Sequence, residues 1–180
     1  MQPLLSVAKA IDTFNQRLGS WVAWLALIMV LVQFVVVLMR YVFGLGSIAM
    51  QESIVYMHGI LFMIGAGYTL LHDGHVRVDI FYREASPKHK ARVDLFGVFA
   101  FLLPVCLLIW IYSWPYVQSA WRVYEGSKET SGIQAVFLLK TIVLVFCVLV
   151  ALQGISLAIH SLAVLLGKEA PKSGEEHEGI

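Results

Sequence analysis

Four long apolar stretches alternate with short polar connections along the chain. They lie at about 21–43, 48–71, 95–121 and 133–166. A helix of about 20 apolar residues crosses the hydrocarbon core of a bilayer, so each stretch is long enough to span a membrane. Lipid offers the backbone no hydrogen-bond partners, which makes helices the expected form of these segments. The pattern therefore predicts an all-α membrane protein with four transmembrane helices.

An amphipathic segment precedes the first apolar stretch. Its apolar positions recur at helical spacing, and its polar positions fall on the opposite face. The apolar positions are Leu4, Ala8, Ile11, Phe14 or Asn15, and Leu18, and the polar ones are Lys9, Asp12 and Gln16. This pattern predicts that residues 1–20 form an interfacial helix on the membrane surface. At the other end, residues 167–180 are polar and acidic, which predicts a disordered cytoplasmic tail.

Local signals place helix ends and contact faces within this plan. Ser47 is a predicted N-cap, and the pair Ser86-Pro87 is typical of a helix start. In the second stretch, small residues on one side predict close approach of another helix; they are Gly59, Ala66 and Gly67. Pro104 is expected to kink the third stretch, and Pro115 to kink or end it.

Basic residues are unevenly distributed between the two sides that this topology defines. Nine fall on the side of the termini and the central connection: Lys9, Arg17, Arg77, Arg83, Lys88, Lys90, Arg92, Lys168 and Lys172. Four fall on the other side: Arg40, Arg122, Lys128 and Lys140. Because Lys and Arg in short loops stay on the cytoplasmic side, we expect both termini in the cytoplasm.

Composition and motifs exclude several classes of function. The chain is 59% hydrophobic with a net charge of +1, so it has no general basic surface for nucleic acid. Cys106 and Cys147 lie within apolar runs and are interpreted as small core residues. The sequence shows no phosphate-binding loop, metal-ligand cluster or nucleophile with a base, and no apolar stretch has an acidic residue in its interior. We therefore expect neither an enzyme, nor a cofactor or metal site, nor a transporter complete in itself.

One alternative is a stand-alone four-helix membrane protein, either a haem-bearing anchor or a small drug-type transporter. Haem ligation needs two facing axial ligands at similar depth, and the candidates within the stretches are His58 and His160. Their predicted depths differ by on the order of 15 Å, which disfavours haem. We instead expect His58 to be buried and satisfied within the helix packing.

An ordered set of short motifs points to a family. The pieces are Arg40-Tyr41-Val42-Phe43, Gln51-Glu52, Gly65-Ala66-Gly67-Tyr68, the run Asp73-Gly74-His75-Val76-Arg77-Val78-Asp79-Ile80-Phe81-Tyr82, Ser86-Pro87, Glu125-Gly126-Ser127, Lys140 and Gln153-Gly154. On four spans, this set resembles the small membrane subunit of tripartite ATP-independent periplasmic (TRAP) transporters, over roughly residues 15–166. The chain departs from many members at Gln51-Glu52, where they carry two acidic residues.

The resemblance implies partners that the residues alone do not reveal. A large multispan membrane subunit would carry substrate and sodium by an elevator-like motion, and a periplasmic binding protein would deliver an organic acid. The chain would then be a scaffold in the bacterial inner membrane, surrounded by lipids, that braces the large subunit and helps to dock the binding protein.

Eight residues are candidates for contact with these partners or for bracing the fold. Arg40 and Glu52 flank the first hairpin, and we predict an ion pair between them; alternatively, Glu52 is held free to dock the binding protein. Asp79 either caps a short interfacial helix or contacts the large subunit, and His75 forms a hydrogen bond within the central loop or helps to fix it for that contact. Arg77 lies between them and is a further candidate for partner contact. Gln153 and His160 share one helix face, on which Ser156 also lies, and this face serves packing within the chain or contact with the partner. His58 completes the set.

Within the first stretch, Gln33, Val37 and Arg40 also share one helix face. A polar stripe in a membrane span usually faces protein rather than lipid, so this face is expected to contact protein.

Overall fold

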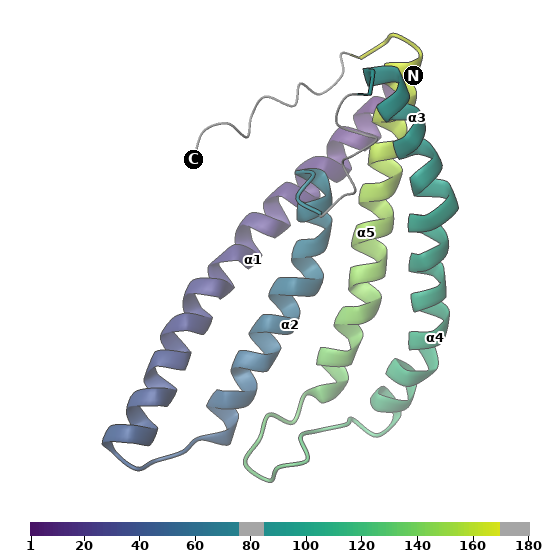
Figure 1. Ribbon diagram of the computed structural model, residues 1–180. Coiled ribbons are helices and arrows are strands. Elements are labelled where there is room, and N and C mark those ends of the chain that lie inside the picture. Colours follow the sequence, from purple (N-terminus) through teal and green to yellow (C-terminus); the bar gives the residue numbers. More distant parts are fainter. Residues whose placement is uncertain (76–84, 170–180) are drawn as a thin grey trace.

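The computed structural model describes residues 1–75 and 85–169 and consists of helices joined by short connections. The helices are α1 (Gln2–Val42), α2 (Ile48–Leu71), α3 (Pro87–Gly97), a π-helical turn η1 (Val98–Leu102), α4 (Leu103–Arg122) and α5 (Val136–Leu165). Because α3, η1 and α4 follow one another directly, they form one continuous rod, and the chain passes along the length of the bundle four times in alternating directions (Figure 1). The predicted all-α fold is confirmed, and the described residues contain no strand.

The two ends of the bundle differ in what they hold. The N-terminus, the start of α3 and the C-terminal end of α5 gather at one end, here called the termini end (Figure 1). The connections α1–α2 and α4–α5 form the opposite end, the hairpin end. Four helical segments are long and apolar enough to cross a membrane: Gln2–Val42, Ile48–Leu71, Pro87–Arg122 and Val136–Leu165. They contain or closely match the four predicted stretches.

The N-terminal segment and the first span form one helix rather than two elements. α1 runs for 41 residues without a break. Gly19 does not interrupt it, because a single glycine only weakens a helix and this one lies against the side chain of Tyr68 in α2. A Cβ at position 19 would overlap the Tyr68 ring, so the glycine permits this close contact between α1 and α2. That residues 1–20 lie on the membrane surface stays a prediction.

The local signals for helix starts are confirmed. The Ser47 side chain accepts a hydrogen bond from the Met50 N–H at 3.4 Å, and that of Ser86 accepts one from the His89 N–H at 3.4 Å. Each serine thus satisfies one of the first backbone donors that a helix leaves unpaired. The hairpin between α1 and α2 contains Gly44 with φ +67°, a backbone conformation that glycine adopts without steric cost.

A π-helical turn lies directly before Pro104, where a kink was expected. Pro104 has no N–H to donate, and in a regular α-helix its ring would meet the carbonyl of Ala100. In η1 the Leu103 N–H bonds to the carbonyl of Val98, five residues back, which widens the helix at this point. Helix α4 then continues through Pro115 to Arg122, so Pro115 does not end the helix.

Helix α5 is the centre of the fold and packs on all the others. In its most apolar window of 18 residues, 44% of positions are buried, against 6% in α1 and 11% in α2. Small residues permit the close packing. Gly154 of α5 lies against Leu102 of η1, Gly59 of α2 lies near Leu139 of α5, and Gly67 of α2 lies against Asn15 of α1. The predicted contact face of the second stretch is therefore confirmed at both glycines.

Candidate functional site

Polar side chains from α1 and α5 form a network in the interior at the termini end. We call it the termini-end cluster: Asp12 and Asn15 of α1, Gln153, Ser156 and His160 of α5, and Glu169 beyond α5. Asn15, Gln153 and Ser156 are 1%, 3% and 0% exposed. The uncharged part of the cluster therefore lies within the helix contact, while the side chains of Asp12, His160 and Glu169 remain partly exposed.

The carboxylate of Asp12 is the centre of this network. Its Oδ1 accepts hydrogen bonds from Gln153 Nε2 at 2.9 Å and from Ser156 Oγ at 2.6 Å. Its Oδ2 lies 2.9 Å from His160 Nε2. Asn15 Nδ2 donates to Gln153 Oε1 at 2.8 Å, which fixes the orientation of the Gln153 amide. Three side chains from successive turns of α5 thus hold one carboxylate of α1.

His160 joins the network to the segment that follows α5. Its Nδ1 lies 2.8 Å from Glu169 Oε2, while its Nε2 faces Asp12. A ring that faces carboxylate oxygens on both sides suits the doubly protonated imidazolium, which has two N–H donors. Neither nitrogen is open to an axial ligand role in this arrangement. His58 is exposed on α2, so these two histidines do not form a haem site.

A second polar network ties the α4–α5 connection to the helices around it. Glu52 of α2 reaches across to this connection, where its carboxylate accepts hydrogen bonds from Ser127 Oγ and, at 2.6 Å, from the Ile133 N–H. Tyr56 donates to the carbonyl of Ile133 at 3.4 Å. A Cβ at Gly132 would collide with Ser127 Oγ, so the turn needs a glycine there.

An ion pair closes the same connection from the side of α5. Lys140 Nζ lies 2.5 Å from Glu125 Oε2 and 4.0 Å from the centre of the Tyr116 ring. Trp121 Nε1 of α4 donates to Thr141 Oγ1 at 2.8 Å, and Thr141 directly follows Lys140 in α5. We call these residues the hairpin-end cluster: Glu52, Tyr116, Glu125, Ser127 and Lys140. Together they fix the connection against α2, α4 and α5.

The predicted ion pair between Arg40 and Glu52 is wrong. The Glu52 carboxylate turns towards Ser127 and Ile133 instead, and within the described ranges Arg40 has no ion pair and is exposed. Proximity across a hairpin does not decide where a side chain points, and two donors of the α4–α5 connection, Ser127 Oγ and the Ile133 N–H, satisfy the carboxylate instead. The prediction that His58 is buried is also wrong, because its side chain is exposed on α2.

The other candidates separate into two groups. Gln153, Ser156 and His160 lie together as their spacing predicted, and their face packs within the chain against α1. His75 is exposed where the first described range ends. Arg77 and Asp79 lie outside the described residues, as does most of the predicted tail, so their roles stay predictions.

Sequence reasoning missed the partners of the α5 stripe. Asp12 was assigned to a solvent face, yet it points into the contact with α5, and Asn15 lies beside it. A signal for this was present: α1 has small or polar residues at alternating spacings of four and three, which is the seam of two packed helices. The positions are Ala8, Asp12, Asn15 and Gly19, and the buried Val22 continues the same spacing.

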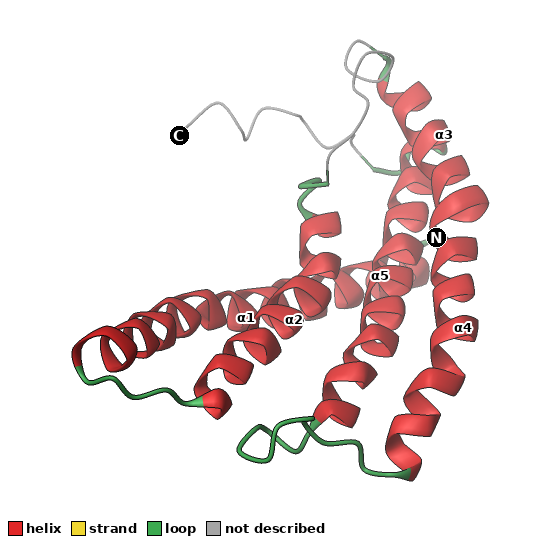
Figure 2. Ribbon diagram, turned by 60° about the horizontal axis from the view of Figure 1, so that its bottom comes forward, coloured by secondary structure: helices red, strands yellow, loops and turns green. Residues whose placement is uncertain are grey.

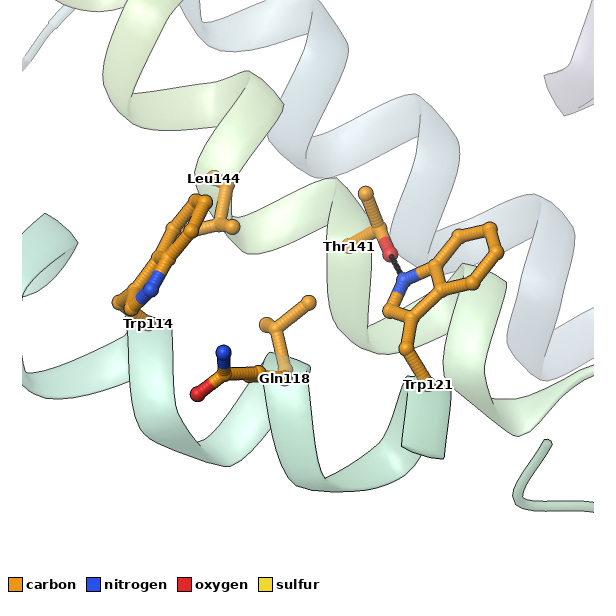
Figure 3. A pocket seen from close by; sticks show the side chains of 6 residues that line it. Trp114, Gln118, Trp121, Thr141 and Leu144 are labelled. Carbon is orange, nitrogen blue, oxygen red and sulfur yellow. Dashed lines mark hydrogen bonds between the residues drawn. The ribbon is translucent and has the colours of Figure 1, made fainter. Parts of the chain in front are cut away.

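A pocket of about 330 Å³ opens between α4 and α5 near the hairpin end. It is lined by Trp114, Val117, Gln118, Trp121, Thr141 and Leu144 (Figure 3). The hydrogen bond from Trp121 to Thr141 closes one side of the pocket, and Gln118 lies at its rim (Figure 3). Trp121 and Thr141 also support the hairpin-end connection, so the pocket borders that cluster and is separate from the termini-end cluster.

Comparison with known protein families gives a match over most of the chain. Residues 29–164 match the family described as "Tripartite ATP-independent periplasmic transporters, DctQ component". No curated protein and no solved structure matches the chain. The matched region contains α2, α3, η1 and α4, all of α5 except its last residue, and the part of α1 that follows residue 28. The chain therefore belongs to the DctQ family, the small membrane component of TRAP transporters, and is an integral protein of the inner membrane.

Proposed function

We propose that the chain is the scaffold subunit of a sodium-coupled TRAP transporter for an organic acid. In this role it braces the large membrane subunit, widens its anchor in the bilayer and helps to dock the periplasmic binding protein. The DctQ family is a family of transporter components and not of enzymes. Sodium coupling, the organic acid and the docking role are parts of the proposal.

The observation that carries the proposal is how the buried polar groups are used. In both clusters, carboxylates are bound by donors of the same chain: Asp12 by α5, and Glu52 and Glu125 by the α4–α5 region. A substrate or ion site needs polar groups that remain open to the ligand. Groups satisfied within the chain instead hold helices and a connection in fixed positions, which suits a scaffold.

The exposed surface supports the same conclusion. Large apolar side chains along α1 and along η1 and α4 are strongly exposed, among them Trp21 at 77%, Phe34 at 61%, Phe99 at 60% and Tyr112 at 77%. In a membrane protein these faces meet lipid or other membrane subunits. Helices with little burial against their own neighbours thus present long surfaces for another subunit.

Reconstitution tests the proposal directly. Proteoliposomes would contain the large subunit alone, this chain alone, or both, with an imposed sodium gradient and the binding protein outside. The binding protein is loaded with an organic acid that it retains in a filter-binding screen. We expect uptake only when both membrane subunits and the sodium gradient are present.

Three outcomes would contradict parts of the proposal. Full uptake by the large subunit and the binding protein without this chain would overturn the scaffold role. Uptake by this chain alone would show that it has its own transport site. Equal uptake with and without the sodium gradient would remove the sodium coupling and leave the scaffold role in place.

A further inference from the structure

One face of α1 carries two polar side chains that the fold leaves without partners. Gln33 and Arg40 lie seven residues apart on this face, with Val37 between them, and all three are exposed. In residues 1–75 and 85–169, no hydrogen bond or ion pair involves the Gln33 amide or the Arg40 guanidinium. We call these three residues the α1 stripe.

The α1 stripe lies on the helix at the edge of the bundle. α1 packs on α2 and α5, and its contact with α5 is at the termini end, where the two helices cross (Figures 1 and 2). Towards the hairpin end, α2 is the neighbour of α1 (Figure 1), and Val36 is a buried residue of this part of α1. The flank that carries the α1 stripe is therefore free to meet another helix.

The position of Gln33 makes this exposure costly in a bilayer. It lies near the middle of the 21–43 stretch, at a depth where water is absent. A side-chain amide without a hydrogen bond in hydrocarbon is unfavourable, and glutamine in a span satisfies itself by bonding across to another helix. Arg40 lies near the end of α1 and carries a full charge, so it needs a carboxylate or a phosphate at that level.

We propose that the α1 stripe docks on a transmembrane helix of the large TRAP membrane subunit. The complementary helix would present a hydrogen-bonding group opposite Gln33 and a carboxylate opposite Arg40, about 10 Å apart along the helix axis. The guanidinium is suited to this because it binds a carboxylate through two parallel hydrogen bonds. The inference rests on the proposed function, since it takes the large subunit as the partner.

Val37 and Val35 give a matched pair of positions for the test. They are the same residue type, lie at similar depth and are 43% and 41% exposed. Two residues apart on a helix, their side chains point to nearly opposite faces. A photo-crosslinking amino acid is placed at either position, and the complex is purified through a tag on the large subunit. We expect a crosslink to the large subunit from position 37 and none from position 35.

Every other result overturns the proposed docking surface. Crosslinks to the large subunit from position 35 alone, from both positions or from neither would do so. A crosslink from position 37 to a second copy of this chain would indicate a homodimer, and one to lipid alone a stripe that faces the bilayer. If the two subunits do not copurify even without the crosslinker, the proposed function is refuted, and the docking surface that depends on it is refuted as well.

A substitution tests the role of the amide itself. Gln33→Leu should lower the affinity for the large subunit by about three- to twenty-fold, the range measured for hydrogen bonds between helices in membranes. Gln33→Asn, which keeps an amide, should lose less. Gln118→Leu is the matched control, because Gln118 is an exposed glutamine of a different span. No effect at position 33, or an equal effect at position 118, would count against the proposal.

Discussion

The two polar clusters hold different parts of the bundle: the termini-end cluster joins two helices, and the hairpin-end cluster holds a connection. At the termini end, side chains meet side chains: the Asp12 carboxylate lies between two helices and is held by three residues of α5. At the hairpin end, a side chain binds backbone: Glu52 accepts from the Ile133 N–H within a connection. The first cluster determines how two helices cross, and the second determines the shape of a turn.

The two clusters also differ in how deeply their side chains are buried. The uncharged members of the termini-end cluster, Asn15, Gln153 and Ser156, are almost fully buried. The charged side chains are partly exposed in both clusters: Asp12 22% and His160 16%, against Lys140 15% and Glu125 38%. Removing one partner of a buried charged network leaves the others unsatisfied, while water compensates an exposed pair. The comparison therefore teaches that the termini-end cluster should contribute more to stability, although both clusters contain charged groups.

The largest expected effect is at Asp12. Asp12→Ala removes the acceptor of Gln153 and Ser156 and leaves His160 with one carboxylate, so unfolding in detergent should become easier by about 3 kcal/mol. Asp12→Asn keeps one oxygen acceptor and should lose less. Titration with a denaturing detergent, followed by circular dichroism, measures the change.

Lys9→Ala is the control for this variant, because Lys9 is an exposed residue one turn away on the same helix. If Asp12→Ala were no more destabilised than Lys9→Ala, the termini-end cluster would not be the stronger of the two.

The next effect is at Glu52. Glu52→Ala removes the acceptor of Ser127 and of the Ile133 N–H, which should cost about 1–2 kcal/mol and loosen the α4–α5 connection locally. Amide hydrogen exchange should rise in residues 125–134 and stay unchanged around Gln153. Protection lost equally in both regions would mean that the two clusters are not independent.

The smallest effect is expected for the ion pair at the rim. Lys140→Met keeps most of the apolar stem but removes the charge near Glu125 and Tyr116, so it should cost only about 0.5–1 kcal/mol. The melting temperature of the purified protein, compared at low and high salt, checks this. A loss as large as that of Asp12→Ala would contradict the distinction drawn between the two clusters.

The spans and helix starts could be predicted from the sequence because their causes are local. An apolar run determines a span, and Ser86 followed by Pro87 determines a helix start, whatever the rest of the chain does. The clusters depend instead on contacts between distant residues: Asp12 and His160 are 148 positions apart. The stripe on α5 was predicted, but its partner was not, because Asp12 satisfies the pattern of a solvent face equally well.

The errors at Arg40 and Glu52 have a related cause. Arg40 and Glu52 are close in the sequence, on either side of the first hairpin. The direction of the Glu52 side chain, however, depends on donors in a connection more than 70 residues away. The family resemblance included Glu125-Gly126-Ser127 and Lys140 without indicating that they surround one turn. Such motifs predicted which residues matter but not which contacts they make, because those contacts depend on the folded arrangement of the helices.

The π-helical turn η1 has a consequence for insertions and deletions. The positions of this long helix that face α5 include Ala91, Val98 and Cys106, which are spaced by seven and then by eight residues. A regular α-helix returns to nearly the same face after seven residues. The π-helical turn takes up the one additional residue between Val98 and Cys106, so the helix presents the same face to α5 before and after η1. Gaining or losing one residue after η1 would rotate the rest of α4 by about 100° and turn Val117 away from α5. Related chains should therefore vary freely in composition along this segment but keep its length constant.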